Sequence, residues 1–224
     1  MALTLHYHPL SSHCWKLLIA LDELGLGFDA RIVNLGDANE RAAYAALWPT
    51  AKIPLLVDGD RVVPETTIQL EYLDHQGGAA SRLLPAEFDA QLQVRLWERL
   101  FDTYVMHPMQ RYIAQQLRAE ADRDALEQAE TARTLAMAYD MIEQGRGPYA
   151  WAASDSFSMA DCTAAPALFY ATTIQPLTER HPQLQAYLGR LLARPSVVRT
   201  LEQARPFFRY YPLHHALPAQ FRGA

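Results

Sequence analysis

The residues best suited to chemistry lie in one turn near the start of the chain, where residues 9–16 read PLSSHCWK. A strand-like stretch precedes this turn and a helical pattern follows it, so Ser11 and Ser12 fall at the beginning of a helix. Unpaired backbone N–H groups and the positive end of the helix dipole stabilise an anion at such a position. A thiolate is an anion that fits there, and the turn therefore predicts thiol chemistry.

The spacing Ser-x-x-Cys distinguishes between two uses of such a turn. A thiol:disulfide oxidoreductase needs a low-pKa cysteine at the first position of Cys-x-x-Cys, where this chain has Ser11. We therefore expect Cys14 to be buried and inert. Serine is also a favoured N-cap residue, so helix capping is the alternative role of Ser11 and Ser12. Tyr7, at the end of the preceding strand, is either a rival candidate for activating a thiol or a core residue.

Two further stretches carry candidate binding residues. Lys52 and Ile53 precede Pro54 at the beginning of an apolar strand, where a proline removes a ladder hydrogen bond. A cis peptide bond would explain this proline, and an ordinary proline at the start of a strand is the alternative. Glu65 and Thr66 open the next helix, where N–H groups and a hydroxyl bind a carboxylate and an acidic side chain binds an ammonium group. Glu65 is also a favourable acidic residue for any first helical turn.

The elements that position these residues change character partway along the chain. The first half has four strand-like stretches, at residues 3–7, 28–33, 53–57 and 61–63. Helical patterns lie between or after them, through the leucines of residues 17–24 and at residues 39–47 and 65–75. The order βαβαββα predicts a small mixed sheet that starts with a parallel β-α-β unit and ends with a hairpin.

After Pro85 the strand patterns stop and only helical spacing remains. It covers residues 86–118, 121–145, 158–175, 183–193 and 195–205. We predict an α/β domain over residues 1–80, an all-helical bundle over residues 86–224, and a linker over residues 77–85. Pro108 and Pro166 interrupt two of the helices and predict kinks there. Ser158 and Asp161 have the spacing of a reciprocal helix cap, which is a folding element.

Composition and charge exclude several classes of protein. A net charge of -5 and a pI near 5.9, with scattered basic residues, argue against a nucleic-acid groove. The sequence has neither a basic leader nor an apolar run of membrane-spanning length, so we expect a cytoplasmic protein with no membrane partner. Cys14 and Cys162 have neither disulfide nor zinc spacing, and the histidine pairs at 6/8 and 214/215 lack further ligands, so no metal is expected.

These motifs, in this order over nearly the whole chain, resemble the cytosolic glutathione transferases. The Ser-x-x-Cys turn continues as Trp-Lys-x-x-Ile-Ala-Leu, which looks like the serine-type branches related to the theta and zeta classes. The resemblance implies a thioredoxin-like first domain in which Ser11 donates a hydrogen bond to the sulfur of glutathione. Ser12 is an alternative for this role, and so is Tyr7, as in the tyrosine-type enzymes. The spacing Ser-Ser-His-Cys departs from the usual zeta Ser-Ser-Cys.

The same resemblance implies how glutathione is held. The peptide bond before Pro54 is cis, Ile53 pairs with the cysteinyl backbone of glutathione, and Lys52 reaches one of its carboxylates. Glu65 and Thr66 hold the γ-glutamyl group. The family has serine where this chain has Thr66, but the hydroxyl is kept.

The resemblance also implies a reaction and its partners. Glutathione is the co-substrate, its thiol attacks a hydrophobic electrophile without a metal, and the enzyme is a homodimer. We expect the electrophile to bind beside Leu10 and the kinked first bundle helix, with Tyr104, Met106 and His107 in the wall. Two other functions stay open. One is a non-catalytic binding protein of the same fold, and the other is a glutathione-dependent isomerase or reductive dehalogenase.

Overall fold

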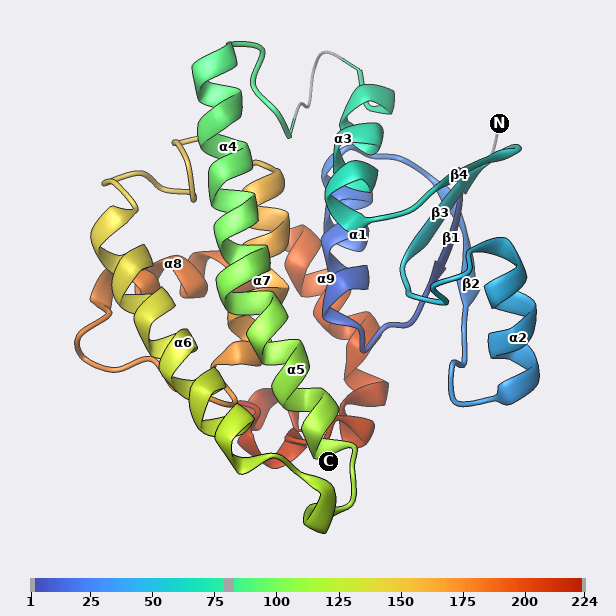
Figure 1. Ribbon diagram of the computed structural model, residues 1–224. Helices are drawn as coiled ribbons and strands as arrows, with labels where there is room; N and C mark the ends of the chain where they lie inside the picture. The colour runs from blue at the N-terminus through green and yellow to red at the C-terminus, as the bar shows by residue number, and fades with distance from the viewer. Residues whose placement is uncertain (1–2, 79–82, 223–224) are drawn as a thin grey trace.

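The computed structural model describes residues 3–78 and 83–222, and Figure 1 shows their arrangement. An α/β part with a four-stranded sheet comes first, and an all-helical part follows it. The predicted fold class is therefore confirmed. The α/β elements end at Gln76 and the first helix of the second part begins at Phe88, while residues 79–82 of the predicted linker lie outside the described residues.

The sheet has the strand order β2-β1-β3-β4. Its strands are β1 (Leu3–Tyr7), β2 (Phe28–Ile32), β3 (Leu55–Asp58) and β4 (Arg61–Val63). As predicted, β1 pairs in parallel with β2, and β3 forms an antiparallel hairpin with β4; β3 also pairs antiparallel with β1. β3 begins at Leu55, later than the predicted strand, because Pro54 has no N–H to donate to the ladder.

Side chains alternate between the two faces of the sheet, so helices must pack on each face to bury its apolar residues. Leu5 and Leu56 point into the main core, beneath α1 (Ser12–Glu23) and α3 (Thr66–Gln76). On the other face, Leu55 packs with Tyr44 of α2 (Ala38–Leu47). In Figure 1, α1 and α3 accordingly lie between the sheet and the helical part, and α2 lies on the far side. The turn before α1 is thus placed at the junction of the two parts.

The described helical part contains six α-helices. They are α4 (Phe88–Leu100), α5 (His107–Gln116), α6 (Ala125–Gly145), α7 (Met159–Ala171), α8 (Pro182–Ala193) and α9 (Pro195–Ala204). Short 3₁₀ turns follow α5 and α9, at Glu120–Asp122, Arg205–Tyr210, His214–Ala216 and Ala219–Phe221. None of the helices in the described ranges is long and apolar enough to cross a membrane.

The two prolines predicted to kink helices behave differently. The predicted helix over residues 86–118 consists of α4 and α5, joined by a π-helical turn, Phe101–Met106 (Figure 1). Pro108 is the second residue after this turn, and because it has no N–H to donate, the regular ladder cannot continue through it. The irregularity expected at Pro108 therefore takes the form of a wider turn. In contrast, α7 runs through Pro166 without a break.

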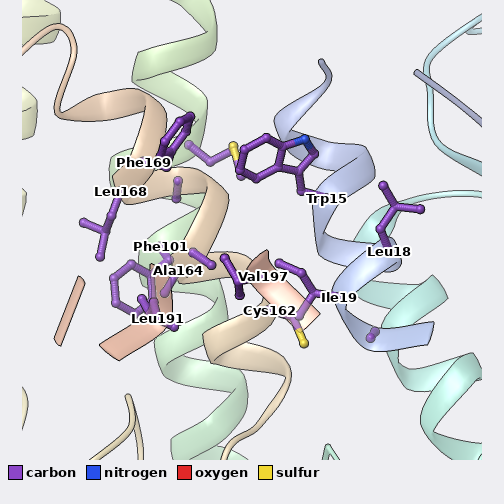
Figure 2. Close-up of a cluster of buried hydrophobic side chains, with 14 of the residues drawn as sticks. Trp15, Leu18, Ile19, Phe101, Cys162, Ala164, Leu168, Phe169, Leu191 and Val197 are labelled. Carbon is purple, nitrogen blue, oxygen red and sulfur yellow. The ribbon is translucent and has the colours of Figure 1, made fainter. Parts of the chain in front are cut away.

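The two parts share one hydrophobic core, centred on the contact between α1 and α7. Figure 2 shows Trp15 of α1 facing the helix that carries Cys162 and Phe169, and the rings of Trp15 and Phe169 have centroids 5.1 Å apart. At the start of α7, the Asp161 carboxylate accepts hydrogen bonds from the backbone and the hydroxyl of Ser158, both at 2.9 Å. The structural role predicted for this pair is confirmed.

Candidate functional site

Two cavities meet near the beginning of α1, where the α/β part faces the helical part. The first, which we name the apolar cavity, has a volume of about 350 Å³, and its lining includes Leu10, Val33, Met109, Ile113, Tyr170 and Tyr211. The second, the polar cavity, has a volume of about 210 Å³, and its lining includes Lys52, Glu65, Thr66, Arg99, Asp102 and His107. Ile53 lines both cavities, so the two cavities adjoin at this residue.

Ser11 lines the apolar cavity and is the N-cap of α1. Its extended backbone, with φ -78° and ψ 120°, lets Oγ accept the N–H of Cys14 at 3.4 Å. Within the described part of the chain, the backbone N–H groups of Ser12 and His13 donate to no acceptor. Two free donors, a hydroxyl and the positive end of the helix dipole therefore come together at this turn. Ser11 caps the helix and faces the cavity at the same time.

The two alternatives to Ser11 are placed differently. Ser12 is 2% exposed, and its Oγ accepts a hydrogen bond from Nε2 of Gln110 at 2.5 Å. Tyr7 is buried, packs edge-on against Phe28 and lines neither cavity. Burial, and secondarily the neighbouring Cys14, raises the pKa of the Tyr7 hydroxyl. Ser11 differs from both, because it is only partly buried and its Oγ bonds within its own turn.

Cys14 lies fully buried beneath the same turn. Burial raises the pKa of its thiol to about 12, so the thiol stays protonated near neutral pH. The prediction that Cys14 is buried is confirmed, and its raised thiol pKa supports the prediction that it is inert. It lines neither cavity, and the geometry of the turn does not support disulfide exchange.

The structure brings together the four residues predicted to hold glutathione. Lys52, Ile53, Glu65 and Thr66 all line the polar cavity, and the Ile53–Pro54 peptide bond is cis. Glu65 has φ +65°, a left-handed conformation that costs a residue with a side chain about 1–3 kcal/mol. Its carboxylate has no hydrogen bond or ion pair to any described residue. Strained residues of this kind concentrate at functional sites, and a free carboxylate there can bind a cationic group.

The sequence did not reveal the charged residues that close the polar cavity from the side of α1 and α4. The Lys16 ammonium makes ion pairs with Glu98 at 2.8 Å and with Asp102 at 2.9 Å, and the Lys16 and Glu98 side chains are 0% exposed. Burial disfavours the Asp102 carboxylate, but Lys16, with smaller contributions from His13 and Arg99, keeps the pKa of Asp102 below its usual value. Arg99 donates to Asp102 at 3.2 Å. The polar cavity therefore rests on a buried ionic network that joins the two parts.

His13 is a second residue that the sequence did not single out. It follows the two serines in the first turn of α1 and lines the polar cavity. Burial lowers its pKa to about 4, and the positive charges of Lys16 and Lys52 and the neighbouring His107 act in the same direction, while Asp102 opposes them. The imidazole is therefore neutral throughout the physiological range.

The depressed pKa of His13 predicts a loss of stability in acid. The unfolded chain takes up the proton near the ordinary pKa of 6.5, whereas the folded chain does so near 4. The contribution of His13 to the free energy of unfolding is therefore present above pH 6.5 and is lost as the pH drops towards 4. The loss between pH 7 and pH 5 is about 2 kcal/mol. Urea unfolding of the wild type and of His13→Gln at pH 7 and pH 5 measures this loss. Between these pH values the free energy of unfolding should fall by about 2 kcal/mol less in the variant than in the wild type. Equal pH dependence in both proteins would contradict it.

The structure places the four residues predicted for the acceptor wall in different surroundings. Leu10 lines the apolar cavity, but His107 lines the polar cavity instead. Met106 is buried in the core, and Tyr104 lines a separate surface hollow beside α6. Tyr104 and Met106 lie within the π-helical turn itself, and His107 is the first residue after it.

The residues of α5 that do line the apolar cavity follow a helical spacing that is present in the sequence. Met109, Ile113 and Leu117 line the apolar cavity at four-residue spacing along and just beyond α5. Across from α5, Tyr170 of α7 and the tail residues Tyr210 and Tyr211 add aromatic surface. The helical spacing was visible in the sequence, but the direction in which it faces depends on the π-helical turn.

The described residues contain no group of three or more histidine, cysteine, aspartate or glutamate side chains placed to hold a metal ion. His8 is instead part of the turn before α1. Its Nδ1 accepts the N–H of Leu10 at 3.1 Å, and its ring packs edge-on against Phe207 of the C-terminal tail. The tail is thereby tied to the turn that carries Ser11.

Comparison with known protein families gives two matches. Residues 10–76 match the family described as glutathione S-transferase, N-terminal domain. Residues 118–190 match glutathione S-transferase, C-terminal domain. The first match covers the α/β part from the turn before α1 onward, and the second covers the helical part from the end of α5 into α8.

Individual relatives agree with these matches over nearly the whole chain. The chain is 27% identical to a glutathione S-transferase of Silene vulgaris, over 90% of this chain and 97% of that protein. It is 29% identical to glutathione S-transferase 3 of Zea mays, over 89% and 93% respectively. Its fold is similar to the crystal structure of a glutathione S-transferase of Methylobacillus flagellatus with glutathione bound, with a TM-score of 0.81, 25% identity, and coverage of 89% of this chain and 98% of that one.

Proposed function

This chain belongs to the glutathione S-transferase family, and on that basis we propose that the polar cavity binds glutathione and that Ser11 activates its thiol. The thiolate then attacks the electrophilic carbon of a hydrophobic substrate in the apolar cavity. The observation that carries this proposal is the meeting of the two cavities near the beginning of α1, where Ser11 lies.

Ser11 and the beginning of α1 supply stabilisation of the required size. A thiol with a pKa of about 8.5 is only about 3% ionised at pH 7. Lowering that pKa by about two units makes most of the thiol nucleophilic and requires about 2.7 kcal/mol of preferential stabilisation. A hydrogen bond to a charged group contributes about 1.5–3 kcal/mol, and the helix dipole adds about 0.3–1 kcal/mol. One hydroxyl at a helix N-terminus is therefore sufficient.

The polar cavity offers partners for each charged end of glutathione. The unpaired carboxylate of Glu65 suits the α-ammonium group, and the Thr66 hydroxyl, at the beginning of α3, suits the adjacent carboxylate. The Lys52 ammonium suits the glycyl carboxylate. Ile53, which lines both cavities, suits the cysteinyl backbone between them. This arrangement directs the sulfur towards Ser11 and the apolar cavity.

An absorbance titration of the thiolate of bound glutathione tests the proposal. In the wild type we expect the bound thiol to titrate well below its free value of about 8.5. Tyr7→Phe should leave that titration unchanged, because Tyr7 lines neither cavity. A bound thiol that titrates at its free value would reject thiol activation and leave a non-catalytic binding protein as the function. A panel of substrates separates transfer to electrophiles from isomerisation or reductive dehalogenation.

We also propose the cytoplasm as the location of the enzyme. Both cysteines, Cys14 and Cys162, are free and buried. Free thiols are maintained in a reducing compartment, which is also where glutathione is held in its reduced form.

We propose that the enzyme is a homodimer formed through the outer face of α3 and α4. Phe88, Leu92 and Leu96 form an apolar stripe at four-residue spacing on α4, with exposures of 46% to 65%. Ile68 of α3 is 57% exposed, and an ion pair between Arg95 and Glu71 holds these two helices together. A row of large apolar side chains on adjacent helices is typical of a surface that a partner covers.

Leu92→Glu is expected to convert the dimer to a monomer, because a buried unpaired carboxylate is strongly unfavourable at an apolar interface. Light scattering coupled to size-exclusion chromatography measures the mass. Leu126→Glu is the matched control, because Leu126 is 82% exposed on α6 and lies outside the stripe. A monomeric wild type, or a Leu92→Glu variant that stays dimeric, would contradict the proposed interface.

A further inference from the structure

Gln110 of α5 is a polar residue in the apolar cavity that the reaction proposed above does not use. It is half-buried, and its Nε2 donates to Oγ of Ser12 at 2.5 Å. This contact joins α5 to the residue directly after Ser11. The Gln110 amide is thereby held next to the position proposed for the glutathione sulfur.

Gln110 has hydrogen-bonding capacity left over. A glutamine amide has two N–H donors, and the bond to Ser12 uses one of them. The Ser12 hydroxyl accepts in that bond, so its own hydrogen remains available for donation. A second N–H and an O–H are thus free beside the reacting centre.

Other polar side chains of the apolar cavity are already engaged. The Tyr170 hydroxyl donates to the backbone of Leu10 at 2.9 Å, and the Tyr211 hydroxyl is bonded to Thr173 at 2.8 Å. Asn34 accepts the N–H of Gly36 through Oδ1 at 3.0 Å, and its amide N–H groups belong to the loop after β2 and not to the turn before α1. The uncommitted side-chain donors beside Ser11 therefore come from Gln110 and Ser12, and they lie next to the free backbone N–H groups of Ser12 and His13.

We propose that Gln110 and Ser12 bind the carbonyl oxygen of the electrophile and make the enzyme selective for conjugated carbonyl compounds. In that reaction the glutathione sulfur forms a bond to the β-carbon, and the π electrons of the C=C bond move to give an enolate with its negative charge on oxygen. The α-carbon then takes a proton from water, which replaces the proton released by the thiol. Donors preorganised at the oxygen stabilise the charge as it develops. This inference rests on the proposed function.

The ratio of two activities tests the inference. The probes are trans-4-phenylbut-3-en-2-one, which forms an enolate, and benzyl chloride, whose displacement forms no oxyanion. Removal of one oxyanion donor lowers the rate by up to about 10²–10³-fold in well-organised sites. We therefore expect Gln110→Met to lower the ratio of kcat/KM for the enone to kcat/KM for benzyl chloride by at least about tenfold. Gln116→Met is the matched control, because Gln116 lies on α5 and lines neither cavity. It should leave the ratio at the wild-type value.

The outcomes separate this inference from the proposed function. An equal loss with both probes in Gln110→Met would show that the residue only braces α5 against α1, and would overturn the inference alone. The inference alone would also be overturned if the wild type lowers the thiol pKa of glutathione but does not turn over the enone. A wild type with an unshifted thiol would overturn both. If Gln110→Met does not fold, Ser12→Ala decides by the same ratio.

Discussion

Ser11→Ala is expected to lower kcat/KM for transfer to an electrophile at pH 6.5 by about tenfold to a hundredfold. The lost interaction is a hydrogen bond to a charged sulfur, which contributes about 1.5–3 kcal/mol, and each 1.36 kcal/mol corresponds to a factor of about ten. Because the variant raises the thiol pKa and leaves its intrinsic chemistry intact, part of the rate should return at pH 8.5. The measurement is the pH profile of kcat/KM for wild type and variant.

The capping role of Ser11 has to be separated from its catalytic role. Loss of the cap alone costs about 1 kcal/mol of stability. Ser11→Asp retains an N-cap acceptor but places a carboxylate beside the sulfur, so it should unfold like the wild type and fail to activate the thiol. Ser156→Ala, on an exposed loop of the helical part, is the matched control for the alanine change. An unchanged pH profile in Ser11→Ala would transfer the role to Ser12 or Tyr7.

Lys16→Met is expected to destabilise the folded protein by about 3–5 kcal/mol, which is a large part of the stability of an ordinary domain. The substitution leaves buried Glu98 with only a long 3.9 Å ion pair to the largely exposed Arg99, and the hydrogen bonds from Thr67 at 3.0 Å and Thr163 at 3.2 Å do not neutralise a carboxylate. Urea unfolding measures the loss. Since Thr67 and Asp102 also line the polar cavity, we expect weaker binding of glutathione in the same variant.

Two controls distinguish a buried ion pair from an ordinary one. In the double variant Lys16→Met/Glu98→Gln the uncompensated charge is removed, so much of the lost stability should return. Arg180→Met breaks the pair with Asp140, whose side chains are 76% and 37% exposed, and should cost less than about 1 kcal/mol. Equal losses in Lys16→Met and Arg180→Met would show that the network contributes nothing beyond surface charge.

The predictions from sequence that proved correct depend on short-range effects. The Ser-x-x-Cys spacing indicated where α1 begins, because N-caps and helix dipoles act within one turn. The alternation of residues 3–7 and the proline at position 54 predicted a strand and the start of the next one for equally local reasons. The candidates that lie in these segments, Lys52, Ile53, Glu65 and Thr66, all reach one cavity.

The predictions for the acceptor wall depend on how two parts of the chain face each other, and they stay predictions. The structure places Tyr104 and Met106 in the π-helical turn at Phe101–Met106 and outside the apolar cavity, whereas Met109, Ile113 and Leu117 line that cavity. Pro108 indicates an irregularity in the sequence, but no local pattern states which side of the following helix faces the cavity.

By itself the sequence determined the order of the elements, the serine at the beginning of α1 and four residues of the α/β part that line the polar cavity, because each depends on neighbours a few positions away. Only the tertiary structure decided which residues of the helical part join them. Gln110 meets Ser12 and Asp102 meets Lys16 across 98 and 86 positions of sequence. Such contacts arise from the packing of α1 against the helical part, and packing at that distance along the chain leaves no signature in the spacing of residues.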